Sequence, residues 1–118
     1  MSTTVTLVAG ICFLLAATPV RAHHSLASKY DTNQSILLKG TITKISWDNP
    51  HTHLSLQAME KGTSDTVWEF EMGSPNLLIM NGWKINTFRR GDHVVVTAYP
   101  ARDGSKSGYA SKVALGYH

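Results

Sequence analysis

The sequence has almost no cysteine, no long apolar run beyond its first part and no cluster of basic residues. Its single cysteine, Cys12, lies in an apolar stretch near the amino terminus that we expect to be removed. The remaining chain would then contain no thiol, which excludes disulfides and cysteine nucleophiles. Such a chain has to be stabilised by its hydrophobic core alone.

The first twenty-two residues have the pattern of a secretory signal peptide. Residues 5–17 are almost wholly apolar, and Val20 and Ala22 are small residues at the positions that a signal peptidase reads. The run is shorter than the roughly 18 residues that a membrane span needs. We therefore predict a signal peptide at residues 1–22, a periplasmic or secreted bacterial location, and no membrane attachment after cleavage.

Positive charge is scattered along the rest of the chain. Removing Arg21 from the 11 Lys and Arg residues leaves ten, against 8 Asp and Glu, and only Arg89 and Arg90 are adjacent. Proteins that neutralise phosphates normally show a clustered basic patch. We therefore predict that nucleic acid is not a partner.

A polar arm at residues 23–34 is followed by five segments whose apolar residues alternate, which is the pattern of β-strands. In the first segment the alternation changes parity after Ile42, which indicates a bend or bulge at Gly40 or in the threonine-rich stretch that follows it. Ser74-Pro75 predicts the start of a short helix over residues 76–80. The predicted strands cover residues 35–47, 53–59, 67–72, 93–99 and 109–115.

Three strands, a short helix and two more strands, with a bent first strand, is the order expected of an OB-type barrel. We therefore predict an all-β fold with small α content: a five-stranded OB-like barrel, with the helix between strands 3 and 4, as a single domain over residues 35–118. A six-stranded sandwich or another small barrel is the alternative.

Several short motifs occur in a fixed order along the whole chain after the leader. Together they resemble a family of short secreted bacterial proteins classed as a domain of unknown function. The resemblance implies an exported single-domain β-protein, and it implies no activity and no catalytic residues. The motifs are Ala22-His23-His24-Ser25, Gly40-Thr41, Asn49-Pro50-His51, Gly73-Ser74-Pro75-Asn76, Gly82-Trp83, Gly91-Asp92 and Tyr99-Pro100-Ala101.

Four histidines suggest a metal site. Cleavage after Ala22 would make His23 the first residue, so that its α-amino group and imidazole could chelate one ion, and such nitrogen ligands favour Cu(II). His51 and His53 are two residues apart on an expected strand, where side chains about 7 Å apart point the same way. We predict copper as the cofactor, held by some of His23, His24, His51 and His53. A solvated arm and structural or solvated histidines are the alternative.

Two tryptophans suggest a second kind of site. OB domains bind ligands by stacking on aromatic side chains. Trp47 at the end of a strand and Trp83 after the helix are candidate ligand-binding platforms, with internal packing as the alternative. Trp68 shares its face with Phe70 and Met72 and is expected in the core.

Catalysis has little support in the sequence. Glu69 and Glu71 share a face, which strand alternation alone explains, and no serine lies in a nucleophile elbow. We therefore expect an exported binding module for copper or a small ligand rather than an enzyme. The alternative is a cofactor-free module that recognises a peptide, a glycan or another envelope protein, and a redox enzyme using the same metal is a third hypothesis.

Overall fold

The computed structural model describes residues 25–59 and 66–116. The predicted signal peptide, His23 and His24 lie outside the described residues. Within the described residues, the chain forms five strands and a short helix between the third and fourth strands, in the predicted order, and residues 25–29 of the arm are also helical. The five strands and the short helix are β1 (Ile36–Ser46), β2 (His53–Ala58), β3 (Thr66–Glu71), α2 (Pro75–Met80), β4 (His93–Pro100) and β5 (Ser107–Leu115).

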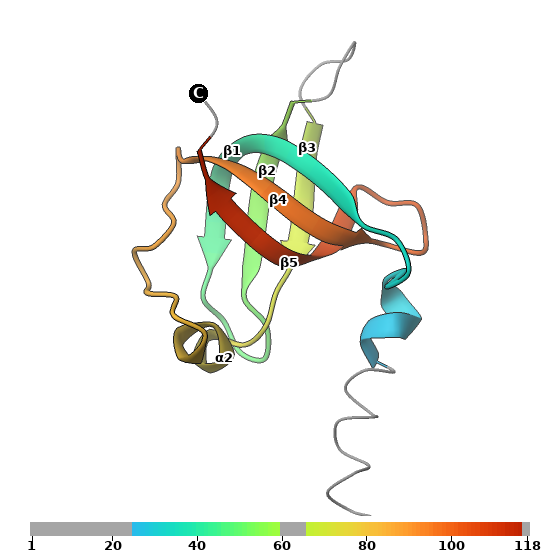
Figure 1. Cartoon of the computed structure of the whole chain (residues 1–118), viewed down its shortest axis with the longest axis horizontal. Coiled ribbons are helices and arrows are strands. Elements are labelled where there is room, and N and C mark those ends of the chain that lie inside the picture. The colour runs from blue at the N-terminus through green and yellow to red at the C-terminus, as the bar shows by residue number, and fades with distance from the viewer. Residues whose placement is uncertain (1–24, 60–65, 117–118) are drawn as a thin grey trace, which may run out of the picture.

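The five strands close into a barrel in the order β1-β2-β3-β5-β4 (Figure 1). Neighbouring strands are antiparallel except β3 and β5, which run parallel over three residue pairs that end at Glu71 and Tyr109. The predicted OB-like barrel, with a helix between the third and fourth strands, is confirmed. The short β3–β5 contact is the seam that closes the barrel.

β1 is long enough to belong to both halves of the barrel. Residues 36–41 pair with β4, and residues 40–46 pair with β2. The register with β2 shifts between Ile42 and Lys44, so the predicted extra residue lies in the threonine-rich stretch. Gly40 has a different role, because an added Cβ would lie 2.4 Å from the carbonyl oxygen of Gln57. The glycine lets two strands approach each other closely.

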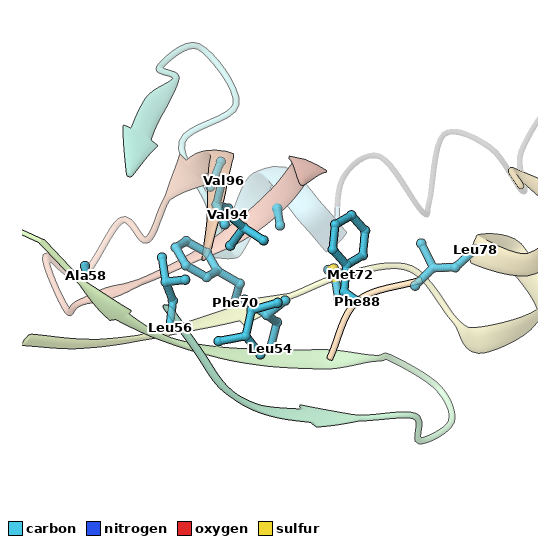
Figure 2. Packing of buried hydrophobic residues seen from close by; sticks show 12 residues of the cluster. Leu54, Leu56, Ala58, Phe70, Met72, Leu78, Phe88, Val94 and Val96 are labelled. Carbon is cyan, nitrogen blue, oxygen red and sulfur yellow. The ribbon is translucent and has the colours of Figure 1, made fainter. Parts of the chain in front are cut away.

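The barrel interior is filled by the alternating residues of its strands. Figure 2 shows Leu54 and Leu56 of β2 and Phe70 of β3 together with Val94 and Val96 of β4. All five side chains are fully buried. The alternating apolar residues from which the strands were predicted are therefore the residues that fill the core.

Helix α2 closes one end of the barrel (Figure 1), where Leu78 joins the core beside Met72 and Phe88. The Ser74 hydroxyl accepts a hydrogen bond from the backbone N–H of Leu77, and Pro75 occupies the first turn. Both features are preferred at helix starts, which confirms the predicted beginning. The segment before α2 lies beside the loop between β1 and β2, because the Gly73 carbonyl accepts a hydrogen bond from the N–H of Thr52.

Candidate functional site

The loop between β1 and β2 holds His51 against the end of β3. The backbone N–H of Thr52 donates to the Gly73 carbonyl at 3.0 Å, and the N–H of Met72 donates to the Thr52 carbonyl at 2.8 Å. The Nδ1 atom of His51 lies 3.0 Å from the Met72 carbonyl oxygen. These bonds fix the imidazole, so its other nitrogen faces the side chain of Glu71.

Part of the arm, residues 25–31, lies against the barrel (Figure 1). The N–H of Asp31 donates to the Pro100 carbonyl at 2.9 Å, and Tyr30 forms a bridge with Ala101. The Arg102 side chain donates from Nε to the Ala27 carbonyl at 2.6 Å. The described part of the arm is therefore docked, which the sequence analysis had left open.

Glu71 is the point at which the arm and the loop meet. The Tyr30 hydroxyl donates to its Oε2 at 2.5 Å, and Lys29 Nζ lies 3.5 Å from the same oxygen. His51 Nε2 lies 3.6 Å from the other oxygen, Oε1. The centroid of the Tyr30 ring also lies 5.9 Å from that of Tyr109. Tyr109 is the residue of β5 that pairs with Glu71 of β3. Tyr30 thus contacts both sides of the β3–β5 seam.

A pocket of about 750 Å³, which we call the Tyr30 pocket, lies between the arm and this end of the barrel. The arm contributes Ser25, Leu26, Lys29 and Tyr30 to its lining. Pockets of roughly 300–1,000 Å³ that combine apolar walls with a few convergent polar groups are typical binding sites for small ligands. The residues from the barrel side are Pro50, His51, Glu71, Gly73, Ser74, Leu77 and Tyr109.

The surroundings of the pocket keep Glu71 ionised and keep Tyr30 and Tyr109 protonated. Burial alone would raise the pKa of Glu71, but the hydrogen bond from Tyr30 and the nearby Lys29 ammonium and His51 ring outweigh burial and lower it. Burial, followed by the hydrogen bond to Glu71, raises the pKa of Tyr30. Burial and the charge of Glu71 also raise the pKa of Tyr109. At neutral pH, Glu71 is therefore an anion and both tyrosines keep their protons.

The predicted metal residues have different positions. His51 lines the pocket, whereas His53 is exposed on the outer side of β2, opposite Glu71 in register. Within residues 25–59 and 66–116, no three His, Cys, Asp or Glu side chains gather in a way that could hold a metal ion. His23 and His24 lie outside that part of the chain. A site with three such ligands that includes His51 would therefore need at least one ligand from outside the described residues.

Trp47 and Trp83, the predicted platforms, contact each other. Their ring centroids are 6.2 Å apart in an edge-to-face arrangement, and Trp83 packs at 4.7 Å from Phe88. Both tryptophans are partly buried and pack against the core. Neither ring lines the pocket between the arm and the barrel, whereas Trp83 lines a second pocket of about 220 Å³, so their role as ligand-binding platforms stays a prediction.

Lys29, Tyr30 and Tyr109 were not predicted as pocket residues, and the position of Glu71 was attributed to strand alternation alone. A signal was present in Tyr30, because a large aromatic residue in an otherwise polar arm needs a place to pack. That signal does not say where the arm docks, so it could not have pointed to Glu71.

The sequence matches the model of DUF6152, described as a family of unknown function, over residues 12–110. The chain belongs to this family. The resemblance that the motifs indicated is thereby confirmed, and the coarse statement of function follows: this DUF6152 protein is a small β-barrel domain of unknown function. The sequence matches none of the curated proteins with which it was compared.

Solved structures similar to this DUF6152 protein include mitochondrial single-stranded DNA binding proteins, Rim1, from S. cerevisiae. One crystal form is 14% identical, with a TM-score of 0.52, over 70% of this chain and 92% of that chain. Another is 15% identical, with a TM-score of 0.51, over 72% of this chain and 98% of that chain. At this identity the likeness shows the fold, an OB-type barrel. In the described segments, no helix is both long and apolar enough for a membrane span.

The prediction that excluded nucleic acid as a partner is wrong. Its basis was scattered charge, yet proteins with the same barrel bind single-stranded DNA. Folding also brings together basic residues that are distant in the sequence, since the N–H of Arg102 donates to the Lys29 carbonyl at 3.1 Å. The spacing of charges along the sequence therefore cannot exclude this class of partner.

Proposed function

We propose that this DUF6152 protein is an exported binding module that holds a transition-metal ion, copper first, where the arm meets the barrel. The ligands would be the α-amino and imidazole nitrogens of His23, freed by cleavage after Ala22, and Nε2 of His51. The observation that carries the proposal is the docked arm, because Ser25 and Leu26 line the same pocket as His51.

The length of the chain supports this arrangement. His23 is two residues ahead of Ser25. An extended chain spans at most about 3.6 Å per residue, so the amino-terminal ligands fall within about 7 Å of Ser25. A tether of two residues would therefore keep these ligands near the pocket that Ser25 and His51 both line.

The surroundings of His51 suit a metal ligand. A carbonyl oxygen only accepts hydrogen bonds, so the contact with Met72 favours a proton on Nδ1 and leaves Nε2 as the ring nitrogen that a metal ion could use. Metal-binding histidines commonly donate from the second ring nitrogen to a backbone carbonyl in this way. The Glu71 carboxylate, 3.6 Å from Nε2, would add negative charge beside a bound cation.

Copper titration against a competing chelator tests the proposal on protein that begins at His23. One alanine placed ahead of His23 should weaken copper binding by orders of magnitude, because it removes the amine from the chelate. His51→Ala should weaken binding by about tenfold or more, through loss of one imidazole ligand. His93→Ala is the matched control, since His93 contacts Thr41 and does not line the pocket.

Equal copper affinity of the extended and the processed forms would refute the amino-terminal site. An unchanged affinity of His51→Ala, with the extended form weakened, would leave a peptide-like site on the arm and refute the role of the barrel. His24→Ala and His53→Ala, measured in the same way, decide which of these histidines adds a further ligand.

Single-stranded nucleic acid is the second candidate partner, favoured by the likeness to single-stranded DNA binding proteins. The Lys106 ammonium lies 5.4 Å from the ring centre of Trp68, and Arg102 and Lys106 flank the same turn between β4 and β5. Binding of single-stranded nucleic acid usually combines basic groups with aromatic rings and weakens as salt increases.

Fluorescence anisotropy of a labelled oligothymidine at two salt concentrations tests this candidate. We expect binding that weakens with salt, and a further loss in the double variant Arg102→Ala/Lys106→Ala. Lys44→Ala removes one exposed lysine of β1 outside this turn and should have little effect. Absence of binding at low salt, or equal losses in the two variants, would reject the candidate.

A further inference from the structure

The ammonium group of Lys29 occupies a position in the Tyr30 pocket that the ammonium of a ligand could take. Its Nζ lies 3.5 Å from Glu71 Oε2 and 5.5 Å from the ring centroid of Tyr30. The Lys29 side chain is 67% exposed, whereas that of Glu71 is only 15% exposed. Ion pairs of exposed lysines contribute little to stability, so Lys29 can leave while the carboxylate stays.

The other groups of the pocket also favour a cation with an apolar chain. Glu71 is the one acidic residue among those that line the pocket in the described ranges. The ring of Tyr30 presents the negative face that attracts ammonium groups. Leu26, Pro50 and Leu77 supply apolar surface, and the volume of about 750 Å³ suits a small molecule.

We propose that the pocket binds a small aliphatic amine, whose ammonium group replaces that of Lys29 between Glu71 and the ring of Tyr30. The alkyl chain would then lie along Leu26, Pro50 and Leu77. An anionic ligand would meet the Glu71 carboxylate at the same point and be repelled. The inference goes beyond the proposed metal and does not rest on it, because it uses the Oε2 side of Glu71 rather than the side that faces His51.

Calorimetric titration of the mature protein with hexylamine, in the presence of a chelator that removes metals, tests the proposal. Hexanoate is the matched ligand of opposite charge and should not bind. Lys29→Ala should strengthen hexylamine binding by up to about fivefold, because it removes the internal competitor for Glu71. Lys39→Ala, an exposed lysine on β1, is the control and should leave the affinity unchanged.

Glu71→Gln should abolish hexylamine binding by removing the anion. Since this change also affects the bond to Tyr30, Tyr30→Phe serves as a second variant: it removes the hydroxyl donor, keeps the ring and Glu71, and should retain binding. The form with one alanine ahead of His23 should lose most of its copper affinity and keep its affinity for hexylamine, so that failure of either proposal can be told from failure of the other.

Three results with the free ligands would overturn the amine site: binding of hexanoate equal to that of hexylamine, weaker hexylamine binding by Lys29→Ala, and unchanged binding by Glu71→Gln. Binding of a lysine-containing peptide without binding of free hexylamine would also overturn it, because the site would then read a peptide rather than a small amine.

Discussion

Replacing Phe70 with alanine is expected to lower the free energy of unfolding by about 3–5 kcal/mol, the usual cost of removing a buried aromatic side chain. Phe70 is the largest fully buried side chain of the barrel, and its ring stacks at 6.1 Å on that of Trp68. Figure 2 shows the ring in the middle of the core cluster. Domains of this kind have a total stability of about 5–15 kcal/mol, so one substitution would remove a large part of it.

Urea denaturation followed by tryptophan fluorescence measures this loss. Leu37→Ala is the control, because that side chain of β1 is 61% exposed and its removal should change stability by about 0.5 kcal/mol or less. Similar midpoints for the two variants would mean that the interior is not packed as described.

The substitution Gly40→Ala is expected to destabilise the barrel by about 3 kcal/mol, although it adds a single methyl group. The new Cβ would lie 2.4 Å from the Gln57 carbonyl oxygen and 2.8 Å from Cγ of Leu56, so the two strands would have to separate. Gly40 pairs with Ala58 on one side and with Val94 on the other, so neither neighbour can move freely.

Gly104→Ala is the matched comparison for Gly40→Ala. Gly104 has a φ of +77° and nothing within 4 Å of an added Cβ, so the change should cost only about 1 kcal/mol of backbone strain. Thermal unfolding of both variants distinguishes the two causes. If Gly104→Ala were the more destabilising variant, close strand approach would not be the main reason for glycine at position 40.

The fold was predictable because its signals are local. In β2, the buried residues Leu54, Leu56 and Ala58 alternate with polar ones, and turn residues mark most strand ends. The start of β5 was less clear and was predicted two residues late. Its first residues, Ser107 and Gly108, have no apolar alternation, and they pair with β3 from a distant part of the sequence.

The candidate site was less predictable because it depends on contacts between distant segments. By alternation, Glu69 and Glu71 are equivalent residues of one strand. In the structure Glu69 is exposed and accepts a hydrogen bond from Ser55, whereas Glu71 is covered by Tyr30 of the arm. No local pattern distinguishes these two carboxylates. His51 was identified from its spacing, but its fixed orientation comes from a bond to Met72 on another strand.

Tyr30 contacts Glu71 of β3 and Tyr109 of β5, one residue on each side of the seam. This arrangement has a consequence for the folding of the newly made chain. Synthesis delivers the amino terminus first, so Tyr30 emerges long before Tyr109, the ring against which it packs. Until β5 appears, the free edge of β3 has no partner, and unpaired strand edges promote association with other chains. The barrel can therefore be completed only after almost the entire polypeptide has been released, and a holding chaperone would be most useful in that interval.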